Sequence, residues 1–263
     1  MSVSTPDPSP PPSSPQAEAG PATAPPPPVP GAAPVPVPPS RAIGVLHSPE
    51  GLATALTALL SVGAAVDLIS SGVNLYIWKL MKDFISDPAG IEDDSGDLAD
   101  VLNVAVAVAQ VALRLATIVV FLVWFHRVRC NGQVFRPDGF TQSAGWAIGG
   151  WFVPIANLFF PYRTARETWG ASTQLAPDGS YRHTSSAPVT AWWTVFVASL
   201  VLDRVFSKRY TAAETPEEIR DVSVLGAVTD VTTIVAAVLA VVFVRKLTAL
   251  QRVKAAQGPL AAV

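Results

Sequence analysis

Charged residues and cysteine are both scarce in this chain of 263 residues. Asp, Glu, Lys and Arg together make up 14% of it, against roughly 25% in an ordinary soluble domain. Hydrophobic residues make up 50%, and the mean hydropathy is +0.38. The formal net charge of −2 provides no basic field for nucleic acid. The single cysteine, Cys130, excludes an intramolecular disulfide and a cysteine-rich metal site.

Sequence signatures of enzymes are missing as well. The chain contains no HExxH zinc helix, no GxSxG elbow and no GxxxxGK[ST] phosphate loop. The three histidines, His47, His126 and His183, are too far apart to form a helical pair of metal ligands. We therefore expect no catalytic residue, no metal and no cofactor, and predict a protein that is not an enzyme. No basic and apolar signal peptide is visible either, so we expect insertion to begin at an internal span.

Proline is abundant, but it is concentrated at one end of the chain. Residues 1–40 hold 16 of the 25 prolines and no Lys or Arg. Such a segment cannot form a helix or the interior of a sheet, so we predict a disordered cytoplasmic tail over residues 1–47 with polyproline II character. Two interpretations remain open for this tail: a solvated spacer, or a ligand for a protein partner that recognises proline.

Long apolar runs carry the excess of hydrophobic residues. A helix of about 20 residues crosses the roughly 30 Å of hydrocarbon in a bilayer. Four runs reach or approach this length, and we predict spans at about 52–80, 98–125, 188–205 and 224–244. Together with their connections they define a membrane domain over residues 48–250, followed by a short cytoplasmic tail over residues 251–263.

Residues 144–162 form an apolar segment that is harder to assign. Pro154 and Pro161 interrupt it, which disfavours a continuous helix. Basic residues collect on the cytoplasmic side of membrane proteins. Four spans with a cytoplasmic N-terminus place 11 Lys and Arg inside and five outside, whereas five spans place seven inside and nine outside. We therefore predict an all-α integral membrane bundle of four transmembrane helices plus a proline-broken interfacial or re-entrant segment, with both termini in the cytoplasm.

Ionisable and amide side chains inside the predicted spans are the first candidate site. Such groups are costly in hydrocarbon and are therefore default candidates for function. We expect Asp67 to form an ion pair with Arg114, since both lie near the middle of antiparallel spans, and Arg204 is a second candidate partner for Asp230. The complete predicted network is Asp67, Asn74, Gln110, Arg114, Arg204 and Asp230. These residues either hold the helices together or line a polar path.

Arginines next to the predicted spans are the second candidate site. The four residues of this basic rim are Arg127, Arg129, Arg163 and Arg166. Anionic lipid headgroups are their natural counter-charge. Simple anchoring by the positive-inside rule is the alternative interpretation.

Three stretches of the chain resemble a known family. They read FLVWFHRVRCN, SAGWAIGGWFVPIANLFFPYR and ARETWGAS, and the resemblance is strong over about residues 119–172. This region resembles the domain of unknown function 4328, a group of bacterial, largely actinobacterial, membrane proteins. The resemblance implies a multi-pass protein of the bacterial plasma membrane, and it implies no catalytic residue.

The sequence thus favours a non-enzymatic membrane protein that acts in interaction or sensing, with the proline-rich tail as a cytoplasmic arm. The bilayer is its expected partner, and nucleic acid is not. The alternative is a small transporter or channel that uses Asp67 and Arg114 as a polar path. Four spans are few for a carrier, and no inverted repeat is evident.

Overall fold

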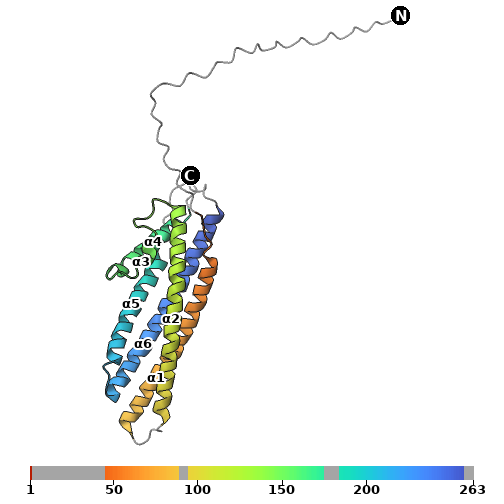
Figure 1. Cartoon of the computed structure of the whole chain (residues 1–263). Coiled ribbons are helices and arrows are strands. Elements are labelled where there is room, and N and C mark those ends of the chain that lie inside the picture. The colour runs from red at the N-terminus through yellow and green to blue at the C-terminus, as the bar shows by residue number, and fades with distance from the viewer. Residues whose placement is uncertain (2–44, 89–93, 175–183, 258–263) are drawn as a thin grey trace. The chain divides into compact units, whose positions relative to one another are not determined.

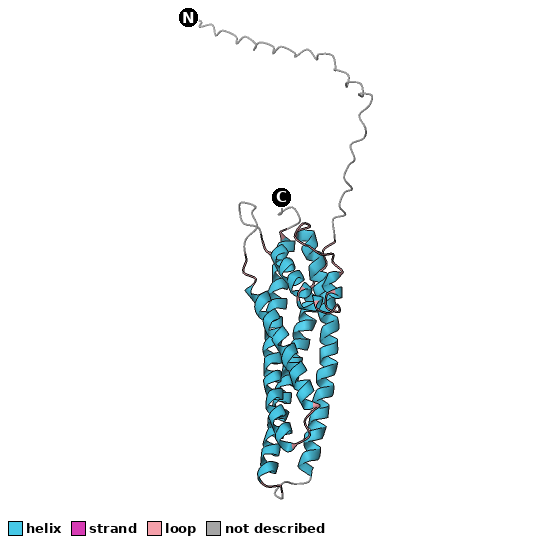
Figure 2. Ribbon diagram, turned by 90° about the vertical axis from the view of Figure 1, so that its left-hand side faces the viewer, coloured by secondary structure: helices cyan, strands magenta, loops and turns pink. Residues whose placement is uncertain are grey.

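The computed structural model describes residues 1, 45–88, 94–174 and 184–257. The chain divides into two units, Met1–Ala42 and Ile43–Val263. The predicted tail over residues 1–47 lies almost wholly outside the described residues, so its structure stays a prediction. Within the described part of the second unit, every regular element is a helix (Figure 2).

Four helices are long and apolar enough to cross a membrane, which confirms the predicted fold class. They are α1 (Glu50–Ser86), α2 (Asp94–Phe135), α5 (Ala187–Tyr210) and α6 (Pro216–Ala256). The 41 residues of α6 extend over about 62 Å at about 1.5 Å per residue. Because the hydrocarbon layer is only about 30 Å thick, the longest helices project beyond it.

The helices begin where the local sequence favours a helix start. At α6, the Thr215 hydroxyl accepts a hydrogen bond from the Glu218 N–H (3.3 Å), and the Glu218 carboxylate accepts one from the Thr215 N–H (3.1 Å). This capping box satisfies N–H groups that have no partner in the first turn. Pro216 follows at the first helical position, where no N–H is needed. Since only five residues separate α5 from α6, the two helices run antiparallel.

The main contacts link the four long helices in the order α2, α1, α6, α5. Successive helices run antiparallel, as the colours of Figure 1 show. The central pair, α1 and α6, packs most closely. At their contact, a Cβ atom on Gly226 would lie only 2.6 Å from the Asn74 side-chain oxygen, so a glycine is required there. The outer helices α2 and α5 have almost no close backbone approach to each other among the described residues.

Aromatic side chains fill the end of the helical unit at which α1 begins and α6 ends. Trp124, Phe125 and Phe243 are fully buried there, and the rings of Trp192 and Phe243 stack at 4.6 Å between centroids. The indole N–H of Trp124 donates to the Thr248 hydroxyl (3.3 Å). This end is therefore the hydrophobic core of the unit.

The proline-broken segment packs against α2 and α5 near the aromatic end. It contains only a four-residue helix α3 (Trp146–Gly149) and a 3-10 turn η1 (Ala156–Leu158) before α4 (Phe160–Ser172) begins. Ile155, directly after Pro154, has a φ of 66°, a conformation that β-branched residues rarely adopt. Its side chain is 76% exposed. This segment contains no helix long enough to cross a bilayer.

Helix α6 does not end where the sequence places the C-terminal tail. The helix continues past the predicted boundary at residue 251 to Ala256, and Gln251 and Lys254 are buried. The Lys254 ammonium donates hydrogen bonds to the carbonyls of Ala171 (2.9 Å) and Thr173 (2.7 Å) at the end of α4. These two bonds offset the free-energy cost of removing the ammonium group from water.

Candidate functional site: a cleft between α2 and α5

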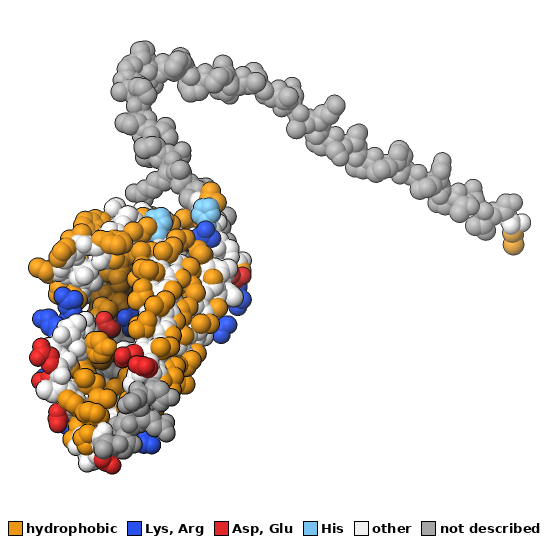
Figure 3. Space-filling model, turned by 60° about the horizontal axis from the view of Figure 1, so that its bottom comes forward, with side chains coloured by type: hydrophobic (Ala, Val, Ile, Leu, Met, Phe, Trp, Pro, Cys, Tyr) orange, Lys and Arg blue, Asp and Glu red, His pale blue; other side chains and the backbone are white. Residues whose placement is uncertain are grey.

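A cavity of about 440 Å³ lies between the four long helices. This volume is within the roughly 300–1,000 Å³ of small-molecule sites. Ile118 of α2 and Leu200 of α5 line it and still expose 51% of their surface each, so they mark the edges of an opening between these two helices. Figure 3 shows a hollow in the hydrophobic surface of the unit with acidic and basic side chains beside it.

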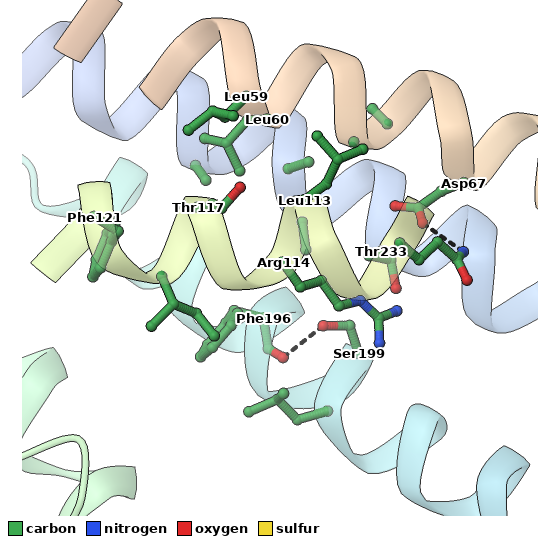
Figure 4. A pocket seen from close by; sticks show the side chains of 18 of the residues that line it. Leu59, Leu60, Asp67, Leu113, Arg114, Thr117, Phe121, Phe196, Ser199 and Thr233 are labelled. Atoms are coloured by element: carbon green, nitrogen blue, oxygen red, sulfur yellow. Dashed lines mark hydrogen bonds between the residues drawn. The ribbon is translucent and has the colours of Figure 1, made fainter. Parts of the chain in front are cut away.

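Small residues on the central helices create the space. Gly63 and Ala64 of α1 and Ala236, Ala237 and Ala240 of α6 form the back wall of the cavity. Larger side chains there would fill it, as they do in ordinary helix packing. The side walls are apolar and come from α2 and α5, as Figure 4 shows for Leu113, Phe121 and Phe196. Trp151 of the proline-broken segment and Trp192 of α5 close the aromatic end.

Polar side chains collect at the other end of the cavity. The Gln110 amide donates to the Asp67 carboxylate (2.9 Å) and more weakly to Asp230 (3.5 Å). The Asn74 amide donates to the second oxygen of Asp230 (3.0 Å). Asp67 and Asp230 are 6% and 7% exposed, so both carboxylates are buried between helices. The structure thus brings together four of the six predicted network residues, from α1, α2 and α6.

The predicted ion pair between Asp67 and Arg114 is wrong. The Arg114 guanidinium lies 3.3 Å from the Asp203 carboxylate of α5, and the two side chains are 47% and 44% exposed. Gln110, one helical turn away, faces α1 and takes the place next to Asp67. The long Arg114 side chain instead reaches across the opening towards α5, where Figure 4 shows it near Ser199.

The second predicted pair, Arg204 with Asp230, does not form either. Asp230 is occupied by the amides of Asn74 and Gln110. Arg204 is exposed and has no hydrogen-bond or ion-pair partner among the described residues. Successive residues of a helix point about 100° apart, so Arg204 cannot share the cavity-facing side of Asp203.

Asp203 is the cavity residue that sequence reasoning missed as a partner of Arg114. A signal for it exists in the spacing of α5. Trp192, Phe196, Ser199 and Asp203 follow each other at intervals of four, three and four residues, and all four line the cavity. This spacing puts them on one face of the helix, so the acid at the end of an aromatic stripe could have been found.

One of the four arginines of the predicted basic rim is buried. Arg129 is only 1% exposed and therefore cannot meet lipid headgroups. Its guanidinium donates to the Gln142 carbonyl (2.6 Å) and lies 3.5 Å from the centre of the Phe140 ring. It therefore holds the connection after α2. Arg127 donates to the Ser48 carbonyl (3.0 Å).

The other two rim residues lie on α4 and are exposed. Arg163 pairs with Glu167 (3.2 Å) and is 54% exposed at its side chain. Arg166 lies over the Tyr162 ring, 5.7 Å from its centre. Both guanidinium groups remain accessible from the aromatic end.

A buried polar cluster at the aromatic end was not predicted. The Asn131 side chain accepts from the His47 N–H (3.0 Å) and donates to the His47 carbonyl (2.7 Å) and to Gln251 (3.1 Å). Gln251 in turn donates to the Val128 carbonyl (2.8 Å) and the Ser172 hydroxyl (3.1 Å). The cluster ties α2, α4 and α6 to the residue where the predicted tail ends. The spacing of Phe243, Leu247, Gln251 and Lys254 on one helical face was the available signal.

A family model described as "Domain of unknown function (DUF4328)" matches residues 87–249. The chain belongs to the DUF4328 family. The match includes the Arg114–Asp203 pair and the proline-broken segment, and it leaves α1 outside. No curated protein and no solved structure matches the chain at a significant level.

Within the described part of this DUF4328 chain, no three His, Cys, Asp or Glu side chains are grouped so that they could hold a metal ion. The cleft itself offers carboxylates, amides, hydroxyls and one guanidinium beside a long apolar wall. These are groups that can bind and orient a molecule with one polar and one apolar end.

Proposed function

We propose that this DUF4328 protein is a non-enzymatic membrane module that senses a molecule dissolved in the bilayer by binding it in the α2–α5 cleft. The observation that carries the proposal is the sideways opening between two helices, which is edged by the exposed apolar side chains of Ile118 and Leu200. A ligand in the membrane can enter there without passing through water. Walls that are mainly apolar favour such a ligand, because small-molecule sites combine apolar walls with a few polar groups.

The polar groups of the cleft support binding over catalysis. Gln110 bridges two carboxylates, and Arg114 is paired with Asp203. A nucleophile would need an adjacent base, and Ser199 instead donates its hydrogen bond to the backbone carbonyl of Phe196 (2.8 Å).

A transporter or channel is the second candidate. The buried cluster of Asp67, Gln110 and Asp230 favours it, since charged groups inside membranes often line ion paths. However, the polar residues occupy only one end of the cavity, and Phe121, Trp151 and Trp192 occupy the other. A continuous polar path through the described residues would have to cross this aromatic end. Sensing by binding at a closed-ended cleft therefore has the better support.

The proposal also covers the location and topology of the module. It resides in the bacterial plasma membrane with both termini in the cytoplasm, so that the proline-rich tail forms a cytoplasmic arm for a protein partner. An even number of antiparallel helices supports this, because residues 50 and 256 then lie at the same end (Figure 1). At that end Arg127, Arg163 and Arg166 bind anionic lipid headgroups.

Filling the cleft tests the proposal. Ala237 lines the cavity, whereas its neighbour Val238 is 55% exposed on the outside of α6. We expect Ala237→Phe to reduce the lipid that stays bound to protein extracted in mild detergent, as counted by native mass spectrometry. Val238→Phe is the matched control and should retain as much lipid as the wild type. Equal retention in Ala237→Phe would contradict the proposal.

A further inference from the structure

The length of the cleft matches one acyl chain. From Asp203 at the polar end to Trp192 at the aromatic end, α5 advances eleven residues, about 16 Å at about 1.5 Å per residue. Half of the hydrocarbon layer measures about 15 Å. Asp203 also lies five residues, about 7.5 Å, inside Lys208 near the end of the helix. A lipid with its polar group at Asp203 therefore points its chain along the cleft towards Trp192.

Charge at the polar end selects the headgroup. Asp67, Asp203 and Arg114 line the cavity, with Asp230 directly behind Asp67. Carboxylates thus outnumber the single guanidinium. A headgroup that carries only negative charge would meet Asp203 and Asp67, and like charges repel strongly where water is excluded. A headgroup with a positive centre is complementary to this end.

Arg114 and Asp203 both keep hydrogen-bonding atoms that their mutual contact does not use. Only one guanidinium nitrogen and one carboxylate oxygen take part in the contact of 3.3 Å. Neither side chain makes a further hydrogen bond or ion-pair contact among the described residues, although both charges also act on Asp67 at longer range. A guanidinium has five N–H donors and a carboxylate about four acceptor sites. Charges left half-satisfied in hydrocarbon are costly, so a ligand that donates to Asp203 and accepts from Arg114 removes this cost.

We infer that the cleft binds a zwitterionic phospholipid with a primary amine in its headgroup. The ammonium group donates hydrogen bonds to Asp203, and the phosphate accepts them from Arg114, since guanidinium and phosphate pair well. One acyl chain lies between α2 and α5 and ends against Trp151 and Trp192. This inference rests on the proposed function, because it names the ligand of the same cleft.

A competition between lipids tests the inference. The full-length protein is reconstituted in vesicles of equal parts phosphatidylethanolamine and phosphatidylglycerol with identical chains, then extracted in mild detergent. Native mass spectrometry counts the retained lipids. We expect the amine lipid to be enriched about tenfold, the effect of one charge-assisted hydrogen bond. Asp203→Asn should reduce the enrichment to near the bulk ratio, Asp203→Glu should retain it, and Asp221→Asn on exposed α6 surface is the control.

The outcomes separate the two proposals. Retention of lipid without enrichment, or enrichment of phosphatidylglycerol, overturns the amine-lipid inference and leaves the proposed function standing. Unchanged enrichment in Asp203→Asn overturns the inference as well. If the wild type retains no lipid, or if Ala237→Phe retains as much as the wild type, the proposed function itself fails.

Discussion

At the scale of single residues, the cleft depends on which side chain of α2 contacts each aspartate. Gln110 and Arg114 lie one turn apart on α2, and either could have met Asp67 of α1. The shorter Gln110 side chain occupies that position, and Arg114 bridges to Asp203. As a result, this ion pair joins α2 to α5, which also meet in the Asn103–Tyr210 hydrogen bond (2.9 Å) and the Phe121–Trp192 ring contact.

This arrangement predicts which pair of residues is energetically coupled. We expect Arg114→Gln and Asp203→Asn each to lower the thermal stability of the detergent-purified protein. The double variant should lose less stability than the sum of the two single losses. The coupling should be below about 1 kcal/mol, because polar couplings in membranes are small and both side chains are half exposed. Double-mutant cycles on unfolding temperatures measure it.

The matched cycle uses Asp67→Asn with Arg114→Gln. Here the coupling should be smaller than in the first cycle, because the Arg114 charge acts on Asp67 only at longer range and without an ion-pair contact. Coupling in this second cycle and additivity in the first would show that Arg114 prefers Asp67 in the membrane.

At the scale of helices, buried polar residues extend α6 beyond its apolar run. Lys254 attaches α6 to the end of α4 through two backbone carbonyls. We expect Lys254→Met to leave both carbonyls without a partner, at a cost of about 1–3 kcal/mol each. Hydrogen exchange of α4 should accelerate, with Arg252→Met, an exposed residue two positions away, as the control. Unchanged protection of α4 would contradict this role.

The helices themselves could be predicted from the sequence because each apolar run is long enough to cross a bilayer. The break at Pro154 and Pro161 was equally readable, since proline removes a hydrogen-bond donor from a helix. The rotation of α2 about its axis was not readable, because it depends on which of its side chains pack against α1. The partner of Arg114 and the burial of Arg129 both depend on that rotation.

At the scale of the whole molecule, the distribution of basic residues sets a direction in the membrane. We expect both termini to face the cytoplasm and the turn at residues 211–215 to face outside. In a Cys130→Ser background, an impermeant thiol reagent added to intact cells should label Ala212→Cys and not Gln257→Cys. Labelling should reach Gln257→Cys only after the cells are opened. The reverse pattern would invert the topology and, with it, the leaflet that supplies the ligand.

Asn131 fixes a residue that precedes α1 to the packed end of α2. It holds the backbone of residue 47 through two hydrogen bonds, 17 residues beyond Arg114 on the same helix. That separation is about 25 Å along a rigid rod. Besides α1, helix α2 packs on α3, α4 and α6, and Trp124, Phe125 and Val128 are fully buried near Asn131. A change of cleft width at Arg114 therefore pivots α2 about this packed end and leaves the anchor at residue 47 in place.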